Sequence, residues 1–581
     1  MKKFLPDLIA ILAFIILSFA YFFPADIEGR ILFQHDTAAG VGAGQESKEY
    51  LERTGERTRW TNSIFGGMPT YQMSPSYDST TSLKGVERVY RLFLPDYVVL
   101  TFIMMLGFYI LLRAFGISAW LAGLGGVIWA FSSYFFILIP AGHIWKFVTL
   151  AYIPPTIAGV VLAYRKKYLL GGIITALFIA LQIQSNHIQM SYYFMFVILF
   201  FVGAYFEDAY KKKELPHFFK ASGVLALAAV VGVCINISNL YHTYEYSKET
   251  MRGKSELKQE GAAASQTSSG LDRDYITNWS YGIGETLTLL VPNVKGGGSG
   301  STMSQSEAAM AKANPMYNGI YSQLPQYFGE QPWTAGPVYV GAFVMFLFVL
   351  GCFIVKGPLK WALLGATIFS ILLSWGKNFM GLTDFFIDYV PMYNKFRAVS
   401  SILVIAEFTI PLLAIFALKE ILSKPDMLKQ EKNCRGVIAA LVLTAGVALV
   451  LAVAPGVFFS SFITTQEMAA LQQALPAEHL APFVANLTEM REAIIASDAW
   501  RSFFIIVIGC LFLFLYQLRK LKASFTLAGI ALLCLIDMWS VNKRYLNDEQ
   551  FVPKSKQSEA FVKTQADEII LQDTTPNYRV L

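Results

Sequence analysis

Runs of about 17 to 22 apolar residues recur along the chain, and each is long enough to cross a hydrocarbon core of about 30 Å. Inside a bilayer only helices and closed barrels satisfy every backbone polar group, and these runs lack the alternation of barrel strands. We therefore predict an all-α integral membrane protein with about 13 transmembrane helices. The predicted spans lie near residues 5–23, 97–112, 119–140, 147–164, 169–186, 190–206, 221–240, 337–355, 359–375, 400–418, 436–457, 502–518 and 524–541.

The composition excludes several classes of protein. With 55% hydrophobic residues, 15% charged residues and a mean hydropathy of +0.46, a soluble multidomain protein is excluded. The net charge of +6 is too small to indicate a nucleic-acid partner, and no basic patch interleaved with aromatic residues occurs. The five cysteines offer neither a disulfide framework nor a CxxC metal site, because they lie in apolar segments or in a predicted cytoplasmic loop.

Lysine and arginine gather in alternate connections between the predicted spans. These are Lys2, Lys3, Arg113, Lys356, Lys360, Arg519, Lys520 and Lys522, with the basic runs 165–167 and 211–213 and the segment 419–435. The positive-inside rule places these connections and the N-terminus inside, and an odd number of spans leaves the C-terminus outside. Residues 1–23 resemble a signal peptide, but no small-x-small cleavage site precedes Pro24, so we expect a retained signal anchor.

Four predicted outer segments are long, at residues 24–95, 241–336, 458–501 and 542–581. They alternate with membrane blocks at 96–240 (spans 2 to 7), 337–457 (spans 8 to 11) and 502–541 (spans 12 and 13). In the first segment, LKGVERVYRLFL has apolar residues at helical spacing, which favours a helix lying flat on the membrane. We expect the low-complexity stretches AAASQTSSG and VKGGGSGSTMSQ of the second to be mobile, and Pro154 and Pro155 to break the fourth span.

The first outer segment holds the leading catalytic candidates, Asp36 and its neighbour His35. They follow a short apolar stretch and precede a run of small residues containing three glycines, which allows close approach of a ligand or of backbone. A carboxylate here can act as a general base or as a ligand for a divalent metal such as Mg²⁺ or Mn²⁺. The later carboxylates Glu46, Glu49, Glu52 and Glu56 alternate with basic residues and indicate a solvated helix with i,i+4 pairs.

Polar residues return to the same predicted side at two short connections. The string AGHIWK, between spans 3 and 4, holds His143 and Lys146, and QSNHIQ, between spans 5 and 6, holds Asn186 and His187. Such residues can line one cavity between helices, and together they favour an outward-facing site. Capping of helix ends in the headgroup region is an equally good interpretation of any one of them.

Two further residues are candidate ligand contacts. Arg397 lies where the chain re-enters the membrane, and its guanidinium can hold a phosphate by paired hydrogen bonds or anchor the protein to lipid headgroups. Trp60 can stack on a sugar, although an aromatic belt is the usual role of tryptophan at this level.

Several strings of the chain, in order, carry a family resemblance. They are QHD with RWTNSIFGGMPTYQ, GHIWK, SNHIQMSYY, GETLTLLVPN followed by KGG, and VPMYNKFRAVS. In these strings the chain resembles the YfhO-type bacterial membrane proteins, in the longer-looped form typical of Bacteroidetes, over essentially its whole length. Those proteins are counted among the GT-C glycosyltransferases, so the resemblance implies a GT-C-like fold in the bacterial cytoplasmic membrane. Relatives continue beyond the region of TTPNYRVL, so we expect the segment 542–581 to be truncated at its end, which would affect acceptor recognition and activity.

The resemblance also implies a reaction. Such an enzyme takes a sugar from a polyprenyl-phosphate carrier and transfers it, outside the membrane, to a glycan polymer, a lipid or a protein. An acidic residue of the first outer loop is the usual catalytic group of the class, and Asp36 occupies that place. Lys146 and Arg397 would then stabilise the departing phosphate, and Asn186 and His187 would order the sugar or phosphate.

Two other classes of function stay open. A transporter or flippase of lipid-linked saccharides also has many spans, but transporters usually carry charges in mid-membrane and show internal repeats. The clearest charges within the predicted spans are Glu407 and Asp537, and no repeat is evident. A non-catalytic envelope-assembly protein is the third interpretation.

Overall fold

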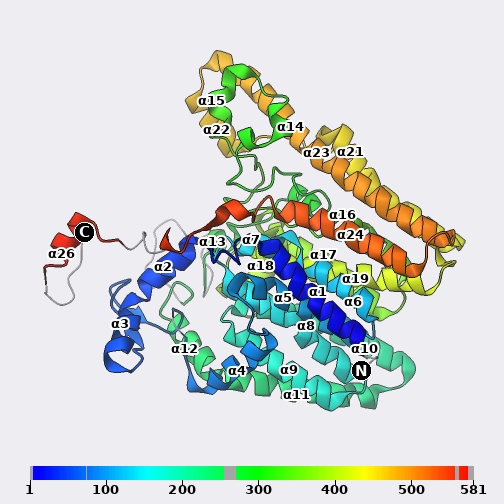
Figure 1. Ribbon diagram of the computed structural model, residues 1–581, viewed down its shortest axis with the longest axis horizontal. Helices are drawn as coiled ribbons and strands as arrows, with labels where there is room; N and C mark the ends of the chain where they lie inside the picture. The colour runs from blue at the N-terminus through cyan, green and yellow to red at the C-terminus, as the bar shows by residue number, and fades with distance from the viewer. Residues whose placement is uncertain (1–3, 74, 254–269, 557–561, 574–581) are drawn as a thin grey trace.

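The computed structural model describes residues 4–73, 75–253, 270–556 and 562–573. The described chain is mostly helical, with very little sheet, and its helices run side by side in a splayed bundle (Figure 1). Its strands are two short antiparallel pairs, β1 with β4 and β2 with β3. The all-α architecture expected from the apolar runs is confirmed, and the protein is a multi-pass membrane protein by the length and composition of its helices.

Every predicted span coincides with one helix or with a broken pair. The helices are α1 (Leu5–Phe22), α5 (Asp96–Ala114), α6 (Ala119–Ala130) with α7 (Ser133–Leu138), α8 (Ile144–Tyr164), α9 (Tyr168–Gln184), α10 (Ile188–Lys212), α11 (Leu215–Ile235), α16 (Ala342–Ile354), α17 (Pro358–Ser374), α19 (Val404–Ser423), α20 (Glu431–Leu441) with α21 (Val447–Val453), α23 (Ala477–Gln517) and α24 (Ala523–Asn542). Within the described residues, nine helical stretches are long and apolar enough to cross a membrane. The count becomes ten if α17 and the helical stretch to Tyr389, bent by 110°, form one span. Because α6, α9 and α16 are shorter, the number of about 13 stays a prediction.

Shorter elements connect these helices. The helices are α2 (His35–Ala43), α3 (Gln45–Thr54), α4 (Thr81–Tyr90), α12 (Ile237–Ser247), α13 (Arg273–Thr277), α14 (Glu307–Met310), α15 (Asn318–Tyr321), α18 (Met380–Tyr389), α22 (Thr465–Ala474) and α26 (Gln565–Ile570). The strands are β1 (Ile31–Leu32), β2 (Trp60–Thr61), β3 (Met68–Pro69) and β4 (Phe551–Val552). The 3₁₀ turns are η1 (Asp78–Thr80), η2 (Gly284–Leu289), η3 (Met303–Gln305), η4 (Pro315–Tyr317), η5 (Gly376–Phe379), η6 (Tyr393–Lys395), η7 (Val399–Leu403), η8 (Met427–Lys429), η10 (Pro455–Val457) and η11 (Asp548–Gln550), and η9 (Val442–Gly446) is a π-helical turn.

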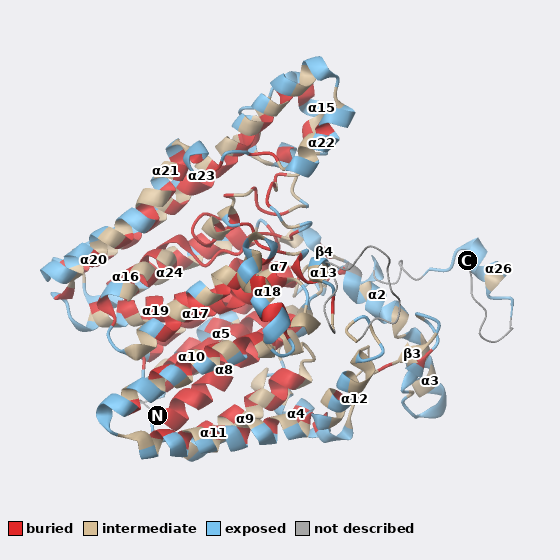
Figure 2. Ribbon diagram, turned by 180° about the vertical axis from the view of Figure 1, so that it is seen from behind, coloured by how far each residue is buried: buried red, intermediate tan, exposed pale blue. Residues whose placement is uncertain are grey.

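Three helices form the centre of the bundle. The apolar windows of α8, α19 and α5 are 100%, 94% and 78% buried, whereas those of α1 and α11 are 28% and 22% buried. Figure 2 shows α5 and α8 mainly in the colour of buried residues, with exposed positions on α11. Because α1 and α11 expose most of their apolar residues, they have the character of lipid-facing helices.

The ends of the helices lie on two opposite faces. The basic-loop face carries the connections after α5, α8, α10, α19 and α23. The ion pairs on this face include Arg113 with Asp7, Lys166 with Glu214, and Arg519 with Asp426. The opposite Asp36 face carries α2, α12 and α13 (Figure 1). These predicted cytoplasmic connections therefore share a face, and the side of the membrane that this face occupies stays a prediction.

The predicted span 119–140 is broken, which the apolar pattern did not indicate. α6 ends before Phe131, α7 begins at Ser133, and the freed polar groups meet the extended segment that leads into α16. Ser133 N donates to Tyr339 O (3.0 Å), and Ser133 Oγ donates to Pro337 O (2.6 Å). Non-helical backbone at membrane depth is tolerated here because another segment of the protein satisfies it.

The prediction that Pro154 and Pro155 break a span is wrong, because α8 continues through both residues. Proline leaves a carbonyl one turn earlier without its helical partner. The carbonyl of Ala151 faces Gly107 of α5, where a Cβ atom would approach it to 2.6 Å. Close packing against a glycine on the neighbouring helix thus covers the backbone that the prolines expose.

Residues from the second and third long outer segments form a separate small core. It lies between α14, α15, α22 and the first half of α23, and its buried residues are Met303, Ala309, Tyr317, Tyr321, Ile463, Leu471, Phe483, Leu487, Met490 and Ile494. The stretch VKGGGSGSTMSQ, expected to be mobile, is packed in part, since Val294 and Met303 are fully buried. The other low-complexity stretch, AAASQTSSG, falls almost wholly within residues 254–269, outside the described residues.

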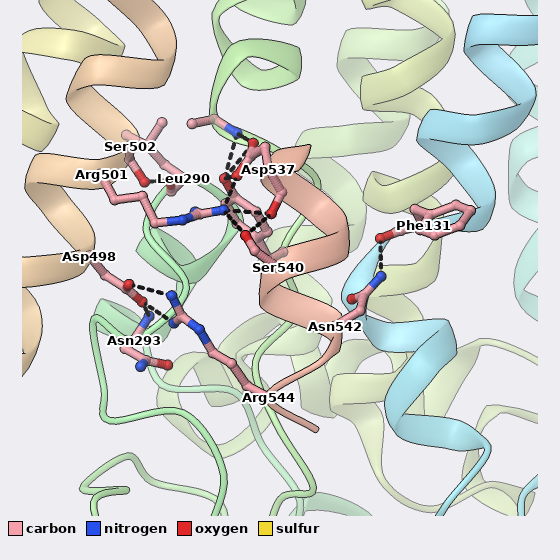
Figure 3. A network of polar contacts seen from close by, with 12 residues as sticks. Phe131, Leu290, Asn293, Asp498, Arg501, Ser502, Asp537, Ser540, Asn542 and Arg544 are labelled. Carbon is pink, nitrogen blue, oxygen red and sulfur yellow. Dashed lines mark hydrogen bonds and ion pairs between the residues drawn. The ribbon is translucent and has the colours of Figure 1, made fainter. Parts of the chain in front are cut away.

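Two ion pairs join α23 to α24 and to the neighbouring loops (Figure 3). Asp498 makes two contacts with Arg544, at 2.7 and 2.8 Å, and accepts a hydrogen bond from Asn293 N. Asp537 accepts from Tyr339 Oη (2.8 Å) and pairs with Arg501 (2.6 Å). The intramembrane charge Asp537 is therefore part of a paired structural network, in which each carboxylate has a guanidinium partner.

The buried Arg491 gives a test of the small core. Its guanidinium is fully buried, contacts Glu467 twice at 2.7 Å and donates to the carbonyls of Phe462 and Pro325. Because Arg491→Met leaves Glu467 without its cation, we expect a loss of about 3 to 5 kcal/mol in the stability of this core. The measurement is the temperature dependence of limited proteolysis within residues 458–490.

Adding Glu467→Gln should restore part of that stability, since the lone carboxylate is then removed. Arg435→Gln breaks the exposed pair with Glu431 and serves as the control, for which little change is expected. Equal protease sensitivity of the Arg491 and Arg435 variants would contradict the structural role of Arg491.

Candidate functional site

Asp36 is held on the bundle by the residues around it. β1 pairs with β4 near the C-terminus, with Ile31 opposite Val552 and Leu32 opposite Phe551. Beyond β1, the buried Gln34 donates through Nε2 to the carbonyl of Ile139, in the connection between α7 and α8. Thr37 Oγ1 donates to Gln34 Oε1 (2.6 Å) and closes the first turn of α2. The start of α2 is therefore anchored on both sides, although most of the Asp36 side chain is exposed.

The closest contact of this loop with the bundle depends on a glycine. Gly142 has φ +80°, a conformation that other residues rarely adopt, and a Cβ atom there would lie 3.2 Å from Asp36 Cβ. The next residue, His143, places Nε2 3.7 Å from Asp36 Oδ2. This distance allows an electrostatic interaction but is too long for a direct hydrogen bond.

The surroundings of His143 favour its neutral imidazole. Burial lowers its pKa, the nearby Lys146 lowers it further, and Asp36 acts in the opposite direction. Arg397 also acts on the imidazole and lowers its pKa. Asp36, Lys146 and Arg397 are thus close enough to act on the His143 imidazole, although the four residues were predicted from three separate parts of the sequence.

Lys146 points into the bundle, in the first turn of α8. Its side chain is buried, donates to Tyr134 Oη and to Ser401 Oγ (2.9 Å), and lies 4.9 Å from the centre of the Tyr134 ring. The carboxylate that influences it is Glu407, which is fully buried and accepts a hydrogen bond from Ser132 Oγ. Lys146 therefore forms the inner, protein-enclosed part of the cluster.

Asn186 and His187 take different positions at the end of α9. Asn186 donates to Gln72 Oε1 (3.4 Å) and accepts from Asn239 Nδ2 (3.2 Å), so it joins the first outer segment to α12. His187 lies near Lys146 and His143, and its Nδ1 is buried without a described hydrogen-bond partner. Burial, with the two neighbouring groups, lowers the pKa of His187 to about 3.

Arg397 is exposed on the Asp36 face and lies against aromatic rings. It donates through Nη1 to Tyr275 Oη (2.8 Å), and its guanidinium carbon lies 5.3 Å from the Tyr275 ring and 5.8 Å from the Trp279 ring. Gln189, two residues after His187, donates to the Arg397 carbonyl (2.7 Å). These contacts hold a cation and two aromatic faces together beside His187.

Trp60 lies in a different part of the first outer segment. It pairs with Pro69 in the β2–β3 ladder, and its indole donates to Asn62 Oδ1 (3.2 Å). Its ring covers Gly67, where a Cβ atom would approach the ring to 2.8 Å. Glu46, expected in an i,i+4 pair, instead accepts hydrogen bonds from Thr61, Asn62 and Ser63 of the same turn.

The residues present offer few ligands for a metal. In the part of the chain that the structure describes, no group of three or more His, Cys, Asp or Glu side chains is placed to hold a metal ion. Asp36 and His143 would supply two ligands, so water or the phosphate of a substrate would have to complete the coordination of a divalent ion. The side chain of His35 lies outside the described residues, so its predicted role and the metal at Asp36 stay predictions.

Sequence reasoning did not find several residues of this cluster. Glu407 was noted only as a charge within a span, although its position in the first turn of α19, facing the start of α8, could have suggested a partner for Lys146. Nothing local in the sequence linked Tyr275 and Trp279 to Arg397, more than a hundred residues away.

The comparisons with known proteins do not identify this chain. It matches no protein-family model, no curated protein and no solved structure. The interpretation of the site therefore depends on its geometry and on the sequence resemblance given above.

Acid should destabilise the wild-type protein through His187. Because its pKa is lowered from 6.5 to about 3, the native state binds fewer protons than the unfolded state, and stability falls as the pH decreases through this window. Between pH 7 and pH 5 the expected loss is about 2 kcal/mol. His187→Gln should lower the sensitivity of the thermal midpoint to this pH change.

The control for this experiment is His479→Gln, at a side chain that is 37% exposed, which should leave the acid sensitivity of the midpoint unchanged. An equal drop of the midpoint in the wild-type and His187→Gln proteins would contradict the burial of a neutral His187.

Proposed function

We propose that the protein is a membrane glycosyltransferase that moves a sugar from a polyprenyl-phosphate donor to an acceptor hydroxyl of a cell-envelope glycan, lipid or protein. The observation that carries the proposal is the placement of the exposed Asp36 beside His143, with Lys146 and Arg397 around the same imidazole. The site lies at one end of the bundle, where a lipid-borne phosphate and a water-borne acceptor can meet. The sequence resemblance to YfhO-type GT-C proteins supports the same function.

The reaction requires a base and a site for the departing phosphate. Asp36 accepts the proton of the acceptor hydroxyl while the oxygen attacks the anomeric carbon, and the bond from this carbon to the phosphate oxygen breaks. One displacement of this kind inverts the anomeric centre. Phosphate leaves without protonation when positive charge surrounds it, and Lys146 and Arg397 are the two cations of the cluster.

The aromatic faces beside Arg397 suit the sugar. Tyr275 and Trp279 are partly exposed and hold their rings against the guanidinium, so a saccharide can stack on a ring while its phosphate meets the cation. We therefore assign the stacking role expected for Trp60 to Trp279. The protein would lie in the bacterial cytoplasmic membrane with its Asp36 face outside, because nucleotide sugars are absent there and a lipid-linked sugar is the available donor.

The first test is the release of polyprenyl phosphate from a polyprenyl-phosphate-sugar pool by the full-length protein in nanodiscs. Asp36→Asn keeps the shape of the side chain but removes the base, and we expect a decrease in rate of about 100-fold or more. Glu56→Gln, at a carboxylate of the same outer segment, is the matched control and should retain the wild-type rate.

The same assay distinguishes the alternatives. A loss of turnover in EDTA would indicate that Asp36 acts as a metal ligand and not as the base. Transbilayer movement of lipid-linked sugar without release of polyprenyl phosphate, unchanged in Asp36→Asn, would overturn the proposal in favour of a flippase. Absence of both activities over a panel of donors and acceptors would favour an envelope-assembly role.

A second test concerns the sugar contact. Trp279→Ala should raise the KM for the donor by about tenfold, because it removes an aromatic stacking interaction of about 1 kcal/mol or slightly more. Trp279→Phe should restore most of the affinity. Trp60→Ala is the matched control, and a larger effect at Trp60 than at Trp279 would contradict the assignment.

A further inference from the structure

A hollow of about 320 Å³ opens on the basic-loop face, far from Asp36. It lies where α8 ends and where α10 turns into α11, at the opposite face of the bundle from the catalytic cluster (Figure 1). Its lining residues are Tyr164, Arg165, Lys166, Tyr205, Asp208, Ala209, Lys212, Glu214, His217 and Phe218. None of these residues takes part in the proposed transfer reaction, so the hollow needs a separate explanation.

The charge around the hollow favours an anion. Lys166 pairs with Glu214 (2.9 Å) and Lys212 pairs with Asp208 (2.7 Å), which balances both carboxylates of the lining. Arg165 adds a further positive charge, and its described hydrogen bond is to a neutral carbonyl, that of Ala114. Lys167, Lys211, Lys213 and Lys220 lie in the same two connections or in the adjoining turns of α10 and α11, and of these Lys211 pairs with Glu207. The surroundings therefore carry an excess of positive charge.

One wall of the hollow is a stack of aromatic rings. The Tyr164 ring lies parallel to Tyr205, at 4.4 Å between centroids, and to Phe218, at 5.5 Å. The edge of this wall continues onto exposed apolar side chains, since Phe206, Tyr210 and Phe219 are 44%, 66% and 63% exposed. Polar and cationic groups thus adjoin an apolar surface at the end of membrane helices, the arrangement required by a molecule with a charged head and an apolar tail.

Hydrogen bonds to neighbouring residues hold two further polar groups of the hollow, the His217 imidazole and the Tyr164 hydroxyl. The His217 imidazole is held between Tyr168 Oη (2.7 Å) and the Tyr164 carbonyl (2.8 Å), and Tyr164 Oη contacts Ser222 Oγ (2.9 Å). These contacts join the ends of α8, α9 and α11 without filling the hollow. The walls are therefore fixed by protein contacts, and the space between them is free for a ligand.

We propose that this hollow binds the phosphate headgroup of an anionic phospholipid from the adjacent leaflet, with the phosphate beside Arg165 and Lys212 and an acyl chain against Phe206 and Phe219. The group recognised by the hollow would be a phosphate ester. A free phosphate carries part of the same chemistry. The aromatic wall and the exposed apolar surface favour the lipid. The proposal does not depend on the transfer reaction or on the side of the membrane.

The test uses the full-length protein, stripped of lipid in detergent and titrated with phosphatidylglycerol, phosphatidylcholine or inorganic phosphate, with bound molecules counted by native mass spectrometry. Arg165→Gln should weaken phosphatidylglycerol binding about fivefold, the effect of one cation near a lipid phosphate. Arg519→Gln removes a cation from the same face but outside the hollow, and should leave the affinity unchanged.

Glu214→Gln provides a test in the opposite direction. It removes a negative charge from the lining and frees Lys166, so phosphatidylglycerol should bind several times more tightly, a gain that misfolding cannot imitate. Equal losses in Arg165→Gln and Arg519→Gln, or equal binding of phosphatidylcholine and phosphatidylglycerol, would overturn the proposal. Binding of inorganic phosphate that competes with the lipid and depends on Arg165 would assign the hollow to a free anion instead.

Discussion

Hydrogen bonds at the break between α6 and α7 join this part of the bundle to the extended segment that leads into α16. Ser132 and Ser133 exchange hydrogen bonds with the backbone of Pro337 and Tyr339, more than two hundred residues away in sequence. Ser132 also donates to Glu407, which lies near Lys146, and Lys146 contacts Ser401. The cluster around Lys146 and His143 therefore depends on an interaction in which backbone groups that no helix satisfies find partners inside the protein.

The helices of the bundle could be predicted because length and apolar character are local properties. All thirteen apolar runs coincide with helices, but the run at residues 119–140 gave no sign of its break. That break depends on partners at Pro337 and Tyr339 that the local sequence does not contain. The predicted break at Pro154 and Pro155 was wrong for a related reason. The glycine that packs against α8 at this point, Gly107, lies on another helix.

The candidate site was only partly visible in the sequence. Asp36, His143, Lys146, His187 and Arg397 could be proposed from their residue types at one predicted membrane surface, and the structure brings them into one electrostatic neighbourhood. Nothing in the sequence favoured Trp279 over Trp60 as a ligand contact. Only the tertiary structure shows that the indole of Trp279 lies beside Arg397. The two-residue pairing of β1 with β4 is too short for any sequence pattern to indicate.

The pairing of β1 with β4 has a consequence for biosynthesis. The segment that steadies Asp36 comes from the far end of the chain, and Tyr21 Oη beside it donates to the carbonyl of Leu546, 525 positions later. A ribosome that has inserted the first helix must therefore add the 525 positions that separate Tyr21 from Leu546 before this corner of the molecule can close. The loop that carries Asp36 is among the first parts to leave the ribosome and among the last to reach its final position, so a chain released early would lack an ordered Asp36 loop.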